Sequence, residues 1–302
     1  MNAPIPISAS DRRHQHIGLV YGLFAYAAWG ILPVYFKALA GVSPLLIVAH
    51  RIVWSLVLLV VLVSAFNGWA AIRNVSRKSL VTLAITATLI AVNWLLYVHA
   101  INSGHILAGS LGYYLNPLAN ILLGRFFLGE ALSRRQWAAV AIAGLGVAVL
   151  AAGALATLWI SLTLCLSFAT YGLLRKQVAV DSVSGLTIET IILAPFALAY
   201  LVFAAGGTAP VFGQTSGQAM LLVAAGFVST APLLMFTEAA RRLPYATVGM
   251  LQFIAPTVQF LLAVLAYGEP VTTAHAIAFA AIWSAVALYM SAMVEGRIRA
   301  RN

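Results

Sequence analysis

Long apolar runs separated by short polar gaps make up most of this chain. A membrane-spanning helix needs about 20 predominantly apolar residues, and ten runs of the chain meet that requirement. Lipid admits only helices and closed barrels as spanning structures, and these runs lack the alternation of barrel strands. We therefore expect ten transmembrane helices. They are residues 17–38, 43–66, 79–102, 106–127, 136–154, 157–175, 183–205, 217–239, 245–267 and 273–293.

The composition supports a membrane protein. Hydrophobic residues make up 63% of the 302 residues and charged residues only 8%, whereas a soluble domain carries about 25% charged residues. Lipid is therefore the solvent for most of the chain. The net charge of +10 does not indicate nucleic-acid binding, because the basic residues occupy short gaps between apolar runs and not one face or tail.

Lysine and arginine residues gather in alternate gaps, which the positive-inside rule assigns to cytoplasmic loops. Lys37 is the one clear basic residue near the opposite side, and Arg51 lies within the second run. The bias predicts both termini in the cytoplasm, for a protein that we expect to cross the bacterial inner membrane several times. The residues assigned to the cytoplasmic side are Arg12, Arg13, Arg73, Arg77, Lys78, Arg134, Arg135, Arg175, Lys176, Arg241, Arg242, Arg297, Arg299 and Arg301.

The chain also contains an internal repeat. Residues 93–135 align without a gap on residues 232–274 at an offset of 139. The first helix contains Trp29-Gly30 and the sixth contains Tyr171-Gly172 in a similar setting. The offset of 139 places Pro117 on Pro256, Gly129-Glu130 on Gly268-Glu269, and Tyr113, Asn116 and Asn120 on Gln252, Ala255 and Gln259.

Each copy of the repeat holds five helices, so the second copy enters the membrane in the opposite orientation. Inverted repeats are typical of secondary transporters, whose substrate site lies near the membrane midplane between the repeats; a purely structural duplication is the alternative. The predicted fold is an all-α membrane protein with ten transmembrane helices as two inverted five-helix repeats. It divides into an N-terminal cytoplasmic tail 1–16, a first repeat 17–154, a second repeat 155–293 and a C-terminal cytoplasmic tail 294–302.

Polar and aromatic side chains recur at helical spacing inside several apolar runs. Polar groups are costly at membrane depth and by default mark a binding site or pathway, although they also hydrogen-bond helices to one another. Arg51, for example, lies eight residues into the second run, about 12 Å deep. The residues predicted to line a central substrate pathway are Arg51, Asn93, Trp94, Tyr97, Tyr113, Asn116, Tyr171, Gln252 and Gln259.

Glu189 is the one carboxylate well inside an apolar run. An isolated carboxylate in a low-dielectric interior tends to be neutral, so Glu189 is a candidate for carrying coupling protons. A fixed ion pair with Arg51 and a plain role in helix packing are the alternatives.

Pro117 and Pro256 interrupt helices at matching repeat positions and are predicted to act as hinges.

Several motifs in the two halves form a specific set. The first half contains Ala25-Tyr26, Trp29-Gly30, Pro33, Tyr35-Phe36-Lys37, His50–Ser55, Asn93–Tyr97 and Ser110–Pro117, and the second contains Tyr171–Lys176, Glu189-Thr190 and Gln252–Pro256. With these motifs the chain resembles, from about residue 17 to residue 292, the RarD branch of the EamA-type drug/metabolite transporter superfamily. The resemblance implies ten helices in paired five-helix repeats and carrier-type transport. It does not specify the substrate.

We therefore expect a secondary-active transporter that exports a small metabolite or drug by alternating access. A passive channel or facilitator, and a membrane scaffold subunit without transport activity, are the alternatives.

The sequence has no P-loop, no His-Glu-x-x-His metal motif and no Gly-x-Ser-x-Gly elbow. We accordingly expect no enzyme activity, no cofactor and no metal. The expected partners are a small-molecule substrate, a coupling proton and the lipid bilayer, for a monomer or homodimer.

Overall fold

The computed structural model describes residues 9–102, 106–207, 210–268 and 273–299, and every regular element within them is helical. The α-helices are α1 (Ala9–Ala38), α2 (Pro44–Ala65), α3 (Trp69–Arg73), α4 (Arg77–Asn102), α5 (Ile106–Phe127), α6 (Arg134–Ala151), α7 (Leu158–Gln177), α8 (Ser182–Ala205), α9 (Ser216–Arg242), α10 (Tyr245–Gln252), α11 (Ile254–Leu261) and α12 (Thr273–Arg299). A 3₁₀ segment, Ala152–Thr157, joins α6 to α7, and a π-helical turn, Leu262–Ala266, follows α11. Of the residues discussed above, Glu269 and Arg301 lie outside the described ranges.

The helices form a membrane protein, as the sequence predicts. Eight helical segments of the described residues are long and apolar enough to cross a membrane. The other two expected spans, 106–127 and 136–154, coincide with the helices α5 and α6. Large apolar side chains face outward; on α8, Phe196, Val202 and Phe203 are 73%, 75% and 81% exposed. Such a surface is unfavourable in water and favourable in lipid.

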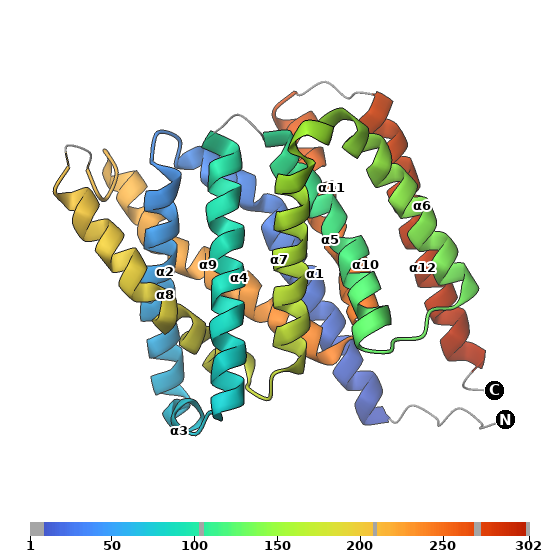
Figure 1. Ribbon diagram of the computed structural model, residues 1–302, viewed down its shortest axis with the longest axis horizontal. Helices are drawn as coiled ribbons and strands as arrows, with labels where there is room; N and C mark the ends of the chain where they lie inside the picture. The colour runs from blue at the N-terminus through green and yellow to red at the C-terminus, as the bar shows by residue number, and fades with distance from the viewer. Residues whose placement is uncertain (1–8, 103–105, 208–209, 269–272, 300–302) are drawn as a thin grey trace.

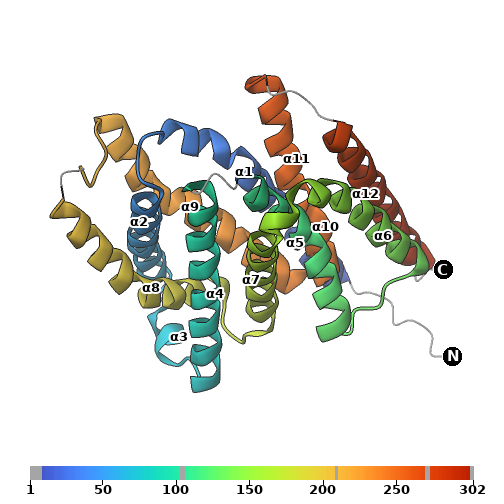
Figure 2. The ribbon, with the colours of Figure 1, turned by 45° about the horizontal axis from the view of Figure 1, so that its top comes forward.

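Helices from the two halves of the chain are interleaved. α6 and α12 pack side by side at one edge of the molecule, and α2 and α8 lie together at the other (Figure 1). Between these pairs α5 packs on α7 and α10, α4 packs on α7, and α1 crosses α9 and α11. Figure 2 shows the same neighbours from a second direction. The two halves therefore share one core and do not form separate bundles.

One side of the molecule collects the helix ends that carry most of the basic residues. α1 begins and α12 ends at the lower edge of Figure 1, where α5 and α7 end and α4 and α6 begin. The end of α9 joins them, because Lys176 Nζ of α7 donates to the carbonyls of Ala240 at 2.7 Å and Leu243 at 2.5 Å. We call this side the basic side. The turn between α1 and α2, residues 39–43, lies on the opposite side (Figure 1).

Side-chain caps define where two of the helices begin near the basic side. Ser133 Oγ accepts from the backbone N–H of Gln136 while the Gln136 side chain accepts from the N–H of Ser133, which is a capping box at the start of α6. Asp181 Oδ1 accepts from the N–H of Ser184 at 2.9 Å and begins α8. These polar caps therefore fix the first residues of α6 and α8.

A break between α10 and α11 divides the expected helix 245–267. Pro256 has no N–H, so it cannot donate to the carbonyl of Gln252 four residues earlier. α10 ends at Gln252 and α11 begins at Ile254. The matching residue Pro117 lies inside α5, which continues through it. The helix is therefore interrupted at one of the two predicted hinges, and the hinge role itself stays a prediction.

Close packing of α2 against α9 depends on a glycine. A Cβ atom built on Gly226 would lie 2.4 Å from the backbone carbonyl carbon of Trp54. The hydroxyl of Ser55 donates to the Gly226 carbonyl at 3.3 Å. Small residues allow such close helix contact in membranes, where van der Waals packing replaces the hydrophobic effect as the driving force.

We predict that Gly226→Ala separates α2 from α9 and destabilises the protein by about 1–3 kcal/mol, the usual range for overpacking. Gly144→Ala is the matched control, since a Cβ at Gly144 meets no atom within 4 Å. Thermal unfolding of both purified variants in the same detergent checks this. Equal melting temperatures for the two variants would contradict the close contact.

Candidate functional site

A cavity of about 420 Å³ lies between α1, α2, α4, α9 and the α10–α11 break. It extends from the middle of α4 and the end of α10 to the α1–α2 turn, on the side opposite the basic side. Its volume falls within the range of about 300–1,000 Å³ that is typical of small-molecule sites. The wall is mostly apolar and aromatic, with a few polar side chains. This combination is also typical of such sites.

Arg51 is the charged residue of this wall. Its Nε donates to Ser229 Oγ at 2.7 Å, which ties α2 to α9. Its guanidinium carbon lies 4.7 Å from the centre of the Trp94 ring, within the range of a cation–π interaction. Arg51 is therefore held in place from two sides by residues that also line the cavity.

Amide side chains of the wall connect neighbouring helices. Asn93 Nδ2 donates to the Leu164 carbonyl at 2.8 Å and to Ser167 Oγ at 3.0 Å, both on α7. Gln252 Oε1 accepts from Asn120 Nδ2 at 2.7 Å. Asn93 and Gln252 therefore line the cavity and also form hydrogen bonds between helices, which are the two alternatives that the sequence leaves open.

Gln259 has a specific local reason for its position. Pro33 lacks the N–H that would normally bond the carbonyl of Trp29 within α1. Gln259 Nε2 donates to that carbonyl at 3.1 Å. A carbonyl without a helical partner is costly at membrane depth, so this bond satisfies it and joins α1 to α11.

The structure brings most of the predicted pathway residues together. Asn116 and Tyr171 lie away from the cavity wall, because Asn116 is 1% exposed and Tyr171 is covered by Phe168 and Phe236. Ser229 lines the wall but was not predicted, since nothing in its spacing distinguishes it from other hydroxyl residues in helices. The predicted residues that line the cavity are Arg51, Asn93, Trp94, Tyr97, Tyr113, Gln252 and Gln259.

Aromatic rings close the cavity toward the basic side. We call Tyr26, Trp29, Phe168, Tyr171 and Phe236 the aromatic floor. The Trp29 ring centre lies 5.6 Å from that of Tyr26 and 5.7 Å from that of Phe168. Phe236 lies 5.2 Å from Phe168 and stacks on Tyr171 at 6.3 Å. Tyr26, Tyr171 and Phe236 are fully buried.

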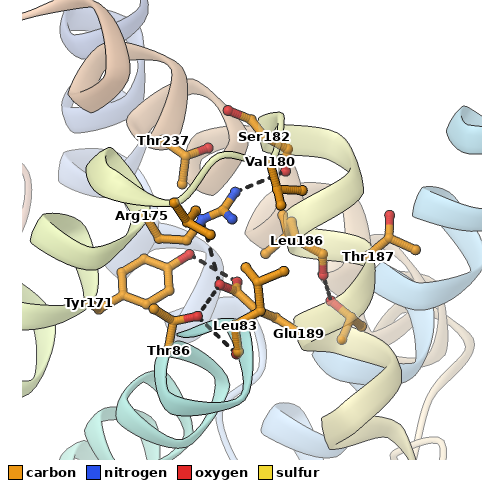
Figure 3. Close-up of polar contacts among 12 residues, drawn as sticks. Leu83, Thr86, Tyr171, Arg175, Val180, Ser182, Leu186, Thr187, Glu189 and Thr237 are labelled. Atoms are coloured by element: carbon orange, nitrogen blue, oxygen red, sulfur yellow. Dashed lines mark hydrogen bonds and ion pairs between the residues drawn. The ribbon is translucent and has the colours of Figure 1, made fainter. Parts of the chain in front are cut away.

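Glu189 lies in a buried polar cluster that includes Tyr171 of the aromatic floor (Figure 3). Its Oε1 accepts from Thr86 Oγ1 at 2.6 Å and lies 3.6 Å from Arg175 Nε, and its Oε2 accepts from the Tyr171 hydroxyl at 3.2 Å. We call Thr86, Tyr171, Arg175 and Glu189 the Glu189 cluster. A Cβ on Gly185 would lie 2.0 Å from an Arg175 nitrogen, so this glycine makes room for the guanidinium.

The ion-pair partner of Glu189 is therefore Arg175 and not Arg51, which is a correction to the pairing considered from the sequence. The sequence placed Arg175 in a cytoplasmic gap, at the end of the run 157–175. α7 continues to Gln177, which keeps Arg175 helical and one turn after Tyr171 on the same face. The arginine is fully buried as a result.

Comparison with known proteins identifies the family. A model of the EamA-like transporter family matches residues 16–152. An uncharacterized transporter of Vibrio cholerae is 44% identical over 92% of this chain and 93% of its own length. Protein RarD of Escherichia coli is 43% identical over 93% of this chain and 96% of its own length. The chain belongs to the RarD branch of the EamA-type drug/metabolite transporters.

Membership of the RarD branch extends across distant bacteria and across both halves of the chain. The uncharacterized transporter YojE of Bacillus subtilis is 38% identical over 92% of this chain and 95% of its own length. A solved crystal structure superposes with a TM-score of 0.69 over 90% of this chain and 98% of its own, at 20% identity, and so shares the fold. This RarD-branch protein is thus a membrane transporter of the bacterial inner membrane.

Further contacts hold the RarD-branch fold closed on the basic side. Arg241 of α9 donates to the carbonyls of Val178 at 3.1 Å and Val180 at 2.5 Å, in the segment between α7 and α8. Glu130 accepts from the backbone N–H groups of Tyr245 at 2.5 Å and Ala246 at 2.9 Å, at the start of α10. A carboxylate is favourable at a helix N-terminus. In the sequence, Glu130 is marked only as half of a repeated Gly-Glu pair.

The cavity geometry predicts which positions water reaches. In a Cys165→Ala background, Tyr97→Cys and Gln259→Cys should react with a membrane-impermeant thiol reagent applied to the side of the α1–α2 turn. Asn116→Cys is the matched control and should stay unreactive in folded protein, since Asn116 is 1% exposed and outside the wall. Mass spectrometry measures the labelled fraction. Faster labelling at residue 116 than at residue 97 would contradict this position of the cavity.

The ion pair predicts a mutational rescue. Glu189→Gln leaves Arg175 buried without a counter-charge, which typically costs about 3–5 kcal/mol, so the amount of folded protein and its melting temperature should fall. Arg175→Gln in the same chain should restore much of both, because both charges are then gone. Arg51→Gln combined with Glu189→Gln is the control and should not restore them. Rescue by the Arg51 change instead would show that the wrong pair has been assigned.

Proposed function

We propose that this RarD-branch protein is a secondary-active transporter that exports a small metabolite or drug by alternating access. The observation that carries the proposal is a cavity open toward one side and closed toward the other. Both halves of the chain contribute to its polar wall, with Arg51 and Asn93 from the first half and Ser229, Gln252 and Gln259 from the second. A site between two halves is where transporters with inverted repeats bind their substrates.

The proposed architecture is ten transmembrane helices in two inverted five-helix repeats, residues 17–154 and 155–293. One feature of the backbone supports it. Gly129 and Gly268 occupy matching positions of the repeat, and each has a φ of +68°, a conformation that favours glycine. The helix contacts support it as well.

In the proposed repeat α1, α2, α4, α5 and α6 correspond in order to α7, α8, α9, α10–α11 and α12. Exchanging the two sets maps the largest observed contacts onto one another, whereas the contacts of α7 with α9 and of α5 with α6 have no comparable counterpart. The pairs α2 with α8, α5 with α10, and α6 with α12 map onto themselves. The contact of α1 with α9 maps onto that of α7 with α4, and the contact of α5 with α7 onto that of α11 with α1. A twofold axis relating two inverted halves produces this pattern.

The positive-inside rule supports a cytoplasmic position for the basic side and for both termini. The cavity then opens to the outside of the cell, and the aromatic floor and the Glu189 cluster close it toward the cytoplasm. This arrangement suits the outward-facing state of a carrier. Uptake of substrate from the cytoplasm requires the floor and the contacts of Arg241 and Glu130 to separate while the α1–α2 side closes.

Glu189 is proposed to couple this change to protons. A gap of about 20 Å³, lined by Glu189, Trp94 and Ser229, adjoins the cavity and has room for one water molecule. A proton that reaches Glu189 through this gap neutralises the carboxylate and so removes its attraction to Arg175. The cluster then loses the ion pair that joins α7 to α8. Protonation thus favours opening on the basic side, and deprotonation favours closure.

Counterflow in proteoliposomes tests the transport proposal. Compounds from a panel of metabolites and antibiotics are first selected by thermal stabilisation of the purified protein. Vesicles loaded with an unlabelled compound should then accumulate the labelled form transiently above equilibrium, which a carrier does and a passive channel does not. Protein-free vesicles are the control. Simple equilibration, without overshoot, would identify a channel or facilitator, and no flux with any stabilising compound would favour a scaffold subunit.

The proton role is tested with the neutral pair Glu189→Gln/Arg175→Gln, which avoids a lone buried charge. We expect this variant to retain counterflow, because exchange needs no net proton movement, and to lose at least about tenfold of the accumulation driven by a proton gradient, since that step depends on a titrating group. Wild-type protein with and without the gradient is the control. Gradient-driven accumulation at the wild-type level in the variant would exclude Glu189 as the proton carrier.

A further inference from the structure

We propose that Arg51 binds the carboxylate of the transported molecule, and that the substrates are small monocarboxylates with an apolar, flat body. This inference rests on the proposed function, since it specifies the substrate class of the same cavity. It follows from how the charges of the described residues are paired, from the geometry of Arg51 and from the chemistry of the rest of the wall.

The cavity holds a positive charge without a protein counter-charge. Among the described residues that line it, Arg51 is the cation and none is an aspartate or glutamate. Glu189 lines the adjoining gap and is already engaged by Arg175, Thr86 and Tyr171. An uncompensated charge inside a membrane is costly. An anion that enters the cavity therefore relieves a cost already built into the protein.

Four further carboxylates have partners elsewhere. Each of the four pairs with a cation or accepts backbone N–H groups at a helix start, away from the cavity. Glu130 caps α10, Asp181 caps α8, Glu238 pairs with Arg242, and Glu295 pairs with Arg135. None of the carboxylates whose contacts the structure describes supplies a counter-charge for Arg51, and the substrate is the molecule that enters this cavity.

The geometry of Arg51 suits a carboxylate in particular. Its bond to Ser229 uses Nε, which leaves the two terminal nitrogens of the guanidinium for another acceptor. A guanidinium binds a carboxylate through two parallel hydrogen bonds. Stacking on Trp94 and the bond to Ser229 fix its plane, so little side-chain entropy is lost on binding.

The charge count narrows the class further. One carboxylate neutralises Arg51, whereas a phosphate monoester brings nearly two charges and leaves one uncompensated. An amine brings a positive charge to a wall that already carries one. The remaining wall is mainly aromatic and apolar, with rings such as Trp29, Tyr97 and Phe168. Such rings favour a flat apolar body over a sugar or a polar peptide.

Calorimetry on the wild-type protein in lipid nanodiscs tests the proposal without transport. The test compounds are indole-3-acetate and phenylacetate, each compared with its primary amide and with its amine, tryptamine or phenethylamine. We expect each carboxylate to bind about 10- to 100-fold more tightly than its amide, the usual effect of hydrogen bonds to a charged group. The amines should bind no better than the amides. Equal or tighter binding of an amide or amine, or no binding of either carboxylate, overturns the proposal.

Variants then assign the effect to Arg51. Arg51→Gln should reduce carboxylate affinity about 10- to 100-fold, to the level of the amide, and leave amide binding unchanged. Arg51→Lys should fall between the two, because lysine keeps the charge but loses the planar fork. Arg125→Gln removes an exposed charge of the same kind and should have no effect. Unchanged carboxylate affinity in Arg51→Gln, at wild-type melting temperature, would overturn the assignment.

Binding and transport can fail separately. A carboxylate that binds through Arg51 but shows no counterflow would contradict the proposed transport and leave the anion site intact. Counterflow of neutral or cationic compounds that persists in Arg51→Gln would support the transporter and overturn the carboxylate proposal.

Discussion

Polar groups inside a membrane have to find their partners within the protein, because lipid offers none. Much of the interior of this molecule follows from that constraint. The carbonyl of Trp29, left without a donor by Pro33, takes one from Gln259 of another helix. Glu189 is surrounded by Thr86, Tyr171 and Arg175. Each such bond joins helices that are distant in the sequence, so satisfying polar groups also assembles the bundle.

The same constraint explains how a tightly packed bundle can still change shape. Many contacts across the basic side are single side chains that bond backbone groups, such as Lys176 to Ala240 and Leu243, or Arg241 to Val178 and Val180. These groups lie near helix ends, where water can replace the lost partner. Deeper contacts, such as those of Glu189, have no such substitute. We therefore expect loss of the charge on Glu189 to weaken this closure more than loss of any one contact at the helix ends.

The sequence predicts the helices well and the partners poorly. Apolar runs determine a span almost directly, so residues 106–127 and 183–205 were expected and Ile106–Phe127 and Ser182–Ala205 are observed. Polar residues at helical spacing also indicated most of the cavity wall. The sequence assigns Arg175 to a cytoplasmic gap because the apolar run ends at this residue. The helix α7 nevertheless continues to Gln177, and Arg175 is fully buried. Hydropathy indicates how costly it is to place a charged residue in the membrane. It does not indicate that Glu189 lies beside Arg175 in the folded protein.

Ser229 and Asn116 show the same limit from opposite directions. Both are polar residues at membrane depth, and the sequence favoured Asn116 because it shares a helical face with Tyr113 and Asn120. The structure turns that asparagine into the packed interior, whereas Ser229 reaches the wall and holds Arg51. A helical face has neighbours on each side, and the identity of the neighbour decides whether a polar residue meets a cavity or another helix.

Arg51 has partners within the protein for its position but no carboxylate among the described residues of the cavity wall. Trp94 and Ser229 fix its position without neutralising it, whereas Arg175, which is fully buried, has a carboxylate beside it. The two arginines therefore differ in what the protein supplies. A charge that is fully compensated within the protein stabilises one arrangement of helices. A charge that is positioned but not compensated favours the binding of an anion, and this difference separates a structural ion pair from a binding site in the same interior.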